Sequence, residues 1–114
     1  VWRADEDDYW FSCAPTARKV RNLAANDRIT VATEDPTRFV SVEGRAEKIE
    51  SAPALEPIID TYAGKYAEFA GGTEEELAAF MAETAFYRVT PERAFGIIET
   101  PEDFARRATR WRWT

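Results

Sequence analysis

The sequence contains no histidine and only one cysteine among its 114 residues. Without histidine, this chain cannot supply a Ser-His-Asp triad, a histidine-ligated zinc or haem site, or an imidazole base. Any proton transfer must therefore use a carboxylate, Lys, Tyr, Cys, solvent or a bound cofactor. The lone cysteine, Cys13, cannot form an internal disulfide. Because that is typical of a reducing compartment, we expect a cytoplasmic protein.

The sequence also lacks a long apolar run and an excess of positive charge. No hydrophobic stretch approaches the ~18 residues that a membrane-spanning helix needs. The first residues do not resemble a signal peptide, so we expect no membrane association. The formal net charge of −6 argues against a general nucleic-acid-binding surface. The length predicts a single domain over residues 1–114.

Alternating apolar and polar residues predict about six short strands. These are residues 1–3, 9–13, 28–33, 38–49, 86–89 continuing to 93–98 after a bulge or bend, and 108–113. Gly44 marks a bulge or a close backbone approach within the fourth strand. Short strands with helices inserted between them predict a small antiparallel barrel that has helices packed at its ends and sides.

Three helices are predicted between these strands. The first begins after an N-cap at Thr16 and ends near Asn26, with Val20, Leu23 and Ala24 on its buried face. The second covers residues 51–70 and ends at Gly71-Gly72. The third follows a capping box at residues 73–76, which places acidic residues in its first turn, as the helix macrodipole favours.

The first helix carries the opposite charge at its start. Arg18, Lys19 and Arg21 lie in its first turns, and residues 10–26 contain no acidic residue. A helix N-terminus already carries about half a positive charge and exposes free N–H groups. Basic side chains there indicate a bound anion, and phosphate is the anion that helix N-termini commonly hold. The alternative is a solvated basic face on a surface helix.

The order of these segments resembles a known family. Strand YWFSC, the segment APTARKVRNLAANDR, strand ITVAT, turn EDPT and strand RFVSVEGRAEKI follow one another, and the tail reads YRVTPERAFGIIETPEDFARRATRWRW. This arrangement is similar to the pyridoxamine 5'-phosphate oxidase-like split barrels, which bind FMN or the deazaflavin F420. The resemblance implies an antiparallel split β-barrel with peripheral helices. It also implies a homodimer with the cofactor at the subunit interface, and an N-terminal helix and strand that this sequence lacks.

The resemblance assigns a few residues to cofactor binding. Arg18 and Lys19 match the basic pair that holds the FMN phosphate, whereas Lys19 and Asn22 match the K-x-x-N-L pattern of the F420 branch. Thr16 falls in the phosphate loop, and Ser12 matches the end of the strand that runs along the cofactor. Because the two patterns share Lys19, the sequence leaves FMN and F420 equally open.

The function that this resemblance implies is a flavin- or deazaflavin-dependent oxidoreductase acting on a small molecule, with hydride transfer carried by the cofactor ring. No residue is assigned as catalytic, and no metal site is expected. The first alternative is a non-catalytic split-barrel module that binds a flavin or another anion. The second is a single-strand nucleic-acid binder that uses the RWRW strand at residues 110–113, which the negative net charge disfavours.

Overall fold

The computed structural model describes residues 1–50, 52–66, 73–103 and 106–113. Its helices are α1 (Arg18–Ala25), α2 (Ala52–Tyr66) and α3 (Glu74–Ala82). Its strands are β1 (Trp2–Arg3), β2 (Asp8–Cys13), β3 (Arg28–Ala32), β4 (Arg38–Ile49), β5 (Ala85–Ile98) and β6 (Thr109–Arg112). All strand pairs are antiparallel, in the order β1-β2-β5-β4-β3, and β6 also pairs with β5.

Strand β5 is the centre of the sheet. On one side it pairs with β4 from residue 86 to residue 98. On the other side its first half pairs with β2 and its second half with β6. The predicted strand over 86–89 and 93–98 is thus confirmed as one continuous strand, which includes residues 90–92. The predicted bulge is confirmed, because the register shifts where Gly44 faces Pro91 and Glu43 faces Arg93, which leaves Glu92 as an extra residue.

The bulge requires the glycine at position 44. A Cβ atom there would lie 2.2 Å from the carbonyl oxygen of Thr90 and 3.0 Å from the Cα of Pro91. Both neighbours are backbone atoms and cannot rotate away. The sequence-based expectation of a close backbone approach at Gly44 is therefore confirmed.

The extra residue also changes which side chains of β5 face which side of the sheet. Val89 lies opposite Ala46 before the bulge, and Ala94 lies opposite Val42 after it. Unbroken alternation would have placed Arg93 and not Ala94 on that face. The bulge thus keeps one face apolar along the whole of β5 and directs the arginine to the other face.

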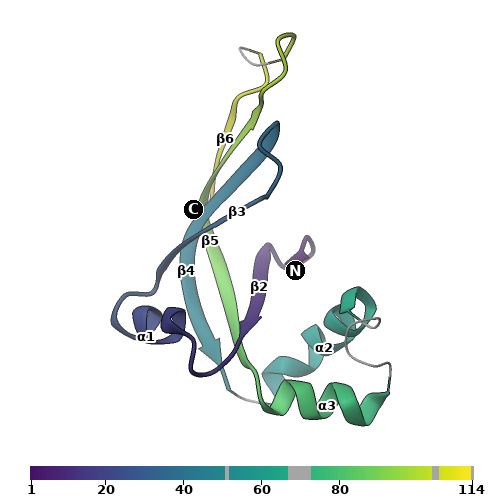
Figure 1. Cartoon of the computed structure of the whole chain (residues 1–114). Helices are drawn as coiled ribbons and strands as arrows, with labels where there is room; N and C mark the ends of the chain where they lie inside the picture. Colours follow the sequence, from purple (N-terminus) through teal and green to yellow (C-terminus); the bar gives the residue numbers. More distant parts are fainter. Residues whose placement is uncertain (51, 67–72, 104–105, 114) are drawn as a thin grey trace.

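The lower half of the sheet is buried on both faces, by α1 on one side and by α2 and α3 on the other (Figure 1). On the α1 side the buried cluster consists of Ala46, Ala85, Tyr87 and Val89. On the other side it consists of Val1, Trp10, Ile49, Ile58, Tyr62 and Phe86, with Leu55 and Met81 packed against it. The helix predicted to begin after Thr73 is confirmed, since the Thr73 hydroxyl accepts a hydrogen bond from the Glu76 amide at 3.2 Å.

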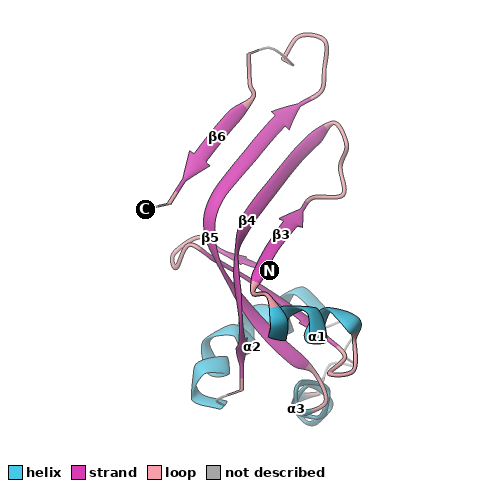
Figure 2. Cartoon of the chain, turned by 90° about the vertical axis from the view of Figure 1, so that its left-hand side faces the viewer, coloured by secondary structure: helices cyan, strands magenta, loops and turns pink. Residues whose placement is uncertain are grey.

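In the upper half of the sheet, β3, β4, β5 and β6 lie side by side without helices against them (Figure 2). The radius of gyration is 16.1 Å, whereas a compact domain of this length would have about 13 Å. The sheet path ends at β1 and β3 and does not close on itself within the described residues. The fold is an antiparallel split barrel with peripheral helices, as predicted.

Two further expectations concern the helices. The second helix is confirmed over α2, while its predicted continuation through residues 67–70 and its end at Gly71-Gly72 lie outside the described residues. No helix in the described part of the chain combines the length and apolar character that crossing a membrane requires.

Candidate functional site

Helix α1 is held against the sheet by a narrow apolar stripe. Pro15 ends β2, because proline has no N–H to continue a strand ladder. Val20 and Leu23 then pack against the α1-side cluster of the sheet. The prediction that Ala24 is buried is wrong. It is exposed, because it lies beyond Val20 on the side away from Leu23, at the edge of the packed stripe. The rest of the helix surface therefore faces solvent.

The start of α1 differs from the prediction by one residue. The N-cap is Ala17, with an extended backbone at φ −60° and ψ 143°, and no side chain caps the helix. The assignment of the N-cap to Thr16 is therefore wrong. The Ala17 amide donates to the Ala14 carbonyl at 2.9 Å, and this turn places Thr16 one position before the cap. Thr16 is exposed, and its hydroxyl does not satisfy the helix N-terminus.

Two cationic side chains lie at the uncapped N-terminus of α1. Arg18 and Lys19 are exposed, and the described first turn of α1 contains no acidic residue. Free N–H groups, the helix dipole and two positive charges all favour an anion at the same place. The N-terminus of α3 is built in the opposite way, with a threonine cap and with Glu75 and Glu76 in its first turn.

The structure brings four of the five predicted site residues together. Thr16, Arg18, Lys19 and Asn22 lie on α1 or on the link before it. Arg18 and Lys19 are four and three residues before Asn22, so both are its neighbours on the helix surface. Ser12 lies apart from them. It alternates with Phe11 and Cys13, which pack on the α1 side, so its side chain belongs to the opposite face of β2.

A groove of about 790 Å³ lies on the apolar face of the upper sheet. It is lined by Trp2, Tyr9, Val31, Ala32, Thr33, Glu34, Val40, Val42, Ala94, Trp111 and Trp113. Gly96 makes room for the ring of Trp111, since a Cβ there would lie 3.0 Å from Cζ3 of that ring. Trp111 is 46% exposed. The volume and lining are those of a small-molecule site or of a surface that another chain covers.

The β1–β2 hairpin beside the groove is fixed by a partly buried ion pair. Arg3 donates from Nε to Asp8 Oδ1 at 2.8 Å and from Nη2 to Oδ2 at 2.5 Å, and its guanidinium lies 5.5 Å from the centre of the Trp10 ring. The hydrogen bonds to Asp8 raise the pKa of Arg3 further above its ordinary value. This bidentate pair keeps Trp10 and the start of β2 in place.

Tyr87 is a titratable residue in the cluster against which α1 packs. Its ring stacks on Phe11, with centroids 5.1 Å apart and planes 6° apart. Burial raises the pKa of Tyr87 above its ordinary value of 10. The phenol therefore stays protonated at neutral pH and serves as packing beside α1, not as a base.

Sequence reasoning missed the groove, although the predicted alternation of the tryptophans with Arg110 and Arg112 on the last strand is confirmed. In the structure Trp111 lies opposite Ala94, while Arg110 and Arg112 belong to the other face of β6. A surface that combines stacking tryptophans with arginines, which the nucleic-acid hypothesis requires, is therefore not formed by this strand. The alternation was visible in the sequence, but the face that each residue joins depends on the bulge at Glu92.

The sequence and the fold are similar to those of known proteins. Residues 1–97 match the family described as pyridoxamine 5'-phosphate oxidase. Among curated proteins, none matches the chain. Among solved structures, a conserved hypothetical protein from Mycobacterium tuberculosis is similar at 23% identity with a TM-score of 0.62, over 78% of this chain and 59% of that one.

Two more solved structures share the fold. A protein from Clostridium acetobutylicum related to general stress protein 26, of the pyridoxinephosphate oxidase family, has a TM-score of 0.61 at 14% identity, covering 93% of this chain and 66% of that one. A FAD-binding protein from Mesorhizobium loti has a TM-score of 0.56 at 20% identity, covering 79% and 67%. The chain thus spans about three fifths to two thirds of the length of these proteins. With most of its residues matched, the chain belongs to the pyridoxamine 5'-phosphate oxidase family.

Proposed function

We propose that the chain is a flavin- or deazaflavin-dependent oxidoreductase in which the start of α1 holds the cofactor phosphate. The observation that carries the proposal is the uncapped N-terminus of α1, where Arg18 and Lys19 stand without an acidic residue in the described first turn. Family membership supports the flavin, and the FAD-binding relative from Mesorhizobium loti is consistent with it.

The residues at this place fit a phosphate chemically. The guanidinium of Arg18 can donate two parallel hydrogen bonds to phosphate oxygens, and the ammonium of Lys19 acts as a compact charge. Asn22, one turn later, adds an amide donor, and Thr16 adds a hydroxyl. When bound, the cofactor ring supplies the hydride chemistry. The chain's own contribution is to bind and orient the cofactor, which suits a sequence without histidine.

The position of Ser12 limits this proposal. Its side chain belongs to the face of β2 away from α1, so within one chain it does not join the phosphate group. We keep Ser12 as a contact only in a homodimer, where a second copy can bring another part of the cofactor to this face. The proposed partners are therefore a small-molecule substrate and a second copy of the chain.

The visible spectrum of freshly purified protein tests the function most simply. A bound flavin gives paired bands, and a deazaflavin gives a single band. If the protein is colourless, both cofactors are titrated separately. We expect one of them to bind and then to be reduced by a donor and reoxidised by an acceptor. Failure to bind either cofactor would contradict the proposal. Tight binding without reduction by any donor would favour the alternative, a non-catalytic binding module.

A further inference from the structure

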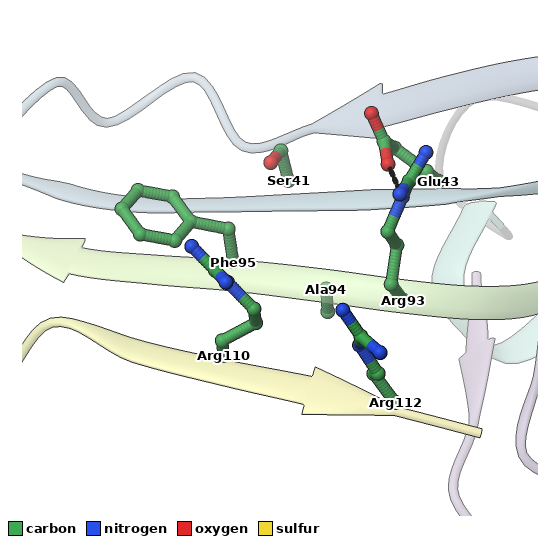
Figure 3. A pocket seen from close by; sticks show the side chains of 7 residues that line it. All are labelled: Ser41, Glu43, Arg93, Ala94, Phe95, Arg110 and Arg112. Atoms are coloured by element: carbon green, nitrogen blue, oxygen red, sulfur yellow. Dashed lines mark hydrogen bonds and ion pairs between the residues drawn. The ribbon is translucent and has the colours of Figure 1, made fainter.

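The face of the upper sheet opposite the groove carries three arginines in one shallow cavity. The cavity has a volume of about 510 Å³ and is lined by Ser41, Glu43, Arg93, Ala94, Phe95, Arg110 and Arg112. Figure 3 shows the arginines rising from β5 and β6, with Glu43 and Ser41 on β4. We call the set Arg93, Arg110, Arg112, Ser41 and Phe95 the arginine face.

The strand register sets the spacing of these charges. Arg112 lies directly opposite Arg93, and Arg110 lies directly opposite Phe95. Arg110 and Arg112 are two residues apart on one strand, which places them roughly 7 Å from each other on the same face. Two like charges directly opposite on neighbouring strands destabilise a sheet. The ion pair between Arg93 and Glu43 offsets part of this repulsion, and an anion bound at Arg112 would offset the rest.

One carboxylate balances only part of this charge. Glu43 lies opposite Arg93 on β4 and forms an ion pair with its Nε. Glu92, at the bulge, is paired with Arg45 at 3.0 Å. Among the residues that the structure describes, Arg110 and Arg112 have no ion-pair partner. In a chain of net charge −6, the cavity keeps two unneutralised guanidinium groups.

We propose that the arginine face binds an organic dianion, at a site separate from the start of α1. Arg110 and Arg112 take the two negative charges, and the Ser41 hydroxyl is within the same cavity as a hydrogen-bond donor. Phe95, which is 39% exposed, offers an apolar surface to the body of the ligand. The ligand class is a small molecule that joins a phosphate ester or a pair of carboxylates to an apolar or aromatic body.

The site is open to solvent, so its affinity should be modest. Arg110 and Arg112 are exposed, and charge pairs at exposed positions are weakened by water and by salt. We expect a dissociation constant on the order of 1 mM at low salt. Binding should weaken as the salt concentration rises, while the contribution from Phe95 should not.

The experiment is a titration followed by backbone amide chemical shifts. Phenyl phosphate and phthalate represent the phosphate ester and the dicarboxylate, and benzoate is the monoanion control. We expect the shifts to fall on β5 and β6, with benzoate binding about fivefold or more weakly than the better dianion. Shifts that map to α1, or equal binding of benzoate and both dianions, would overturn the proposal.

Two double variants that each remove two positive charges show whether binding depends on the arginines of the cavity or only on the net charge of the chain. The double variant Arg110→Gln/Arg112→Gln should weaken dianion binding about tenfold or more. The control double variant Arg106→Gln/Arg107→Gln, whose residues lie outside the cavity, should weaken it less than about twofold. Equal losses in both double variants would contradict the site. Arg112→Lys keeps the charge and should retain most of the binding, which controls for misfolding. Displacement of the dianion by saturating FMN would also overturn the proposal, whereas failure of FMN to bind concerns only the proposed function.

Discussion

At the scale of single residues, Gly44 decides how the two halves of β5 are joined. The bulge brings the backbone of Thr90 and Pro91 so close that no side chain fits at position 44. The same bulge directs Ala94 into the groove and Arg93 to the arginine face. One glycine therefore separates the apolar face of the upper sheet from the basic one.

Replacing this glycine tests the bulge. Gly44→Ala should lower the free energy of unfolding by about 2 kcal/mol or more, because its Cβ would meet the Thr90 carbonyl oxygen at 2.2 Å. Gly64→Ala is the matched control. Nothing lies within 4 Å of a Cβ at Gly64, which is inside α2, so that change should raise stability by about 0.5–1 kcal/mol. Chemical denaturation measures both, and a neutral Gly44→Ala would rule out the close approach.

At the scale of elements, α1 and α3 begin in opposite ways. Helix α3 has a threonine cap, whereas α1 has Ala17 at its cap position and cationic residues in its first turn. A helix that is stabilised by its own side chains needs no ligand. A helix that leaves its N-terminal N–H groups without a side-chain cap is suited to receive an anion.

The two threonines before these helices should respond differently to truncation. Thr73→Ala removes the hydroxyl that accepts from Glu76 and should cost about 1 kcal/mol of stability. Thr16→Ala removes no cap and should change stability by less than about 0.5 kcal/mol. Thermal and denaturant unfolding of both variants give the comparison. An equal loss in the two would show that Thr16 does cap α1.

Much of this element arrangement could be predicted from the sequence, because it depends on local signals. Alternation located β2, β3, β4 and β6 to within a residue or two, and the capping box located α3. The faces of the upper strands depend instead on a register shift between β4 and β5, where the paired residues Glu43 and Arg93 are 50 positions apart in sequence. The side on which Ser12 and the RWRW residues lie follows from tertiary packing, which no local pattern encodes.

At the scale of the whole molecule, the upper sheet exposes more apolar surface than a compact monomer needs. Trp2, Val40 and Trp111 are all exposed beside the groove, and the radius of gyration exceeds that of a compact domain. A second copy of the chain covering this half would bury these side chains. The proposed homodimer thus has a candidate surface in the upper half of the sheet.

Sedimentation velocity tests this assembly. The molar mass derived from sedimentation should be that of a dimer, which is twice the 13.0 kDa of one chain. Trp111→Glu places a charge in the groove and should shift the equilibrium toward monomer. Phe80→Glu, at an exposed apolar position of α3, should leave the mass unchanged. A monomeric wild-type chain, or a Trp111 variant that dimerises as well as the wild type, would contradict the proposed surface.

The central claim, that the start of α1 holds the cofactor phosphate, is tested most directly by comparing the affinities of FMN and riboflavin, which lacks the phosphate. The same comparison applies to F420 and its phosphate-free chromophore. We expect the wild-type chain to bind the phosphorylated form about tenfold or more tightly. Arg18→Gln/Lys19→Gln should abolish that difference without changing riboflavin affinity, whereas Lys48→Gln on β4 should preserve it. Equal affinities for the two forms in the wild type, or an unchanged difference in the Arg18/Lys19 variant, would contradict the account.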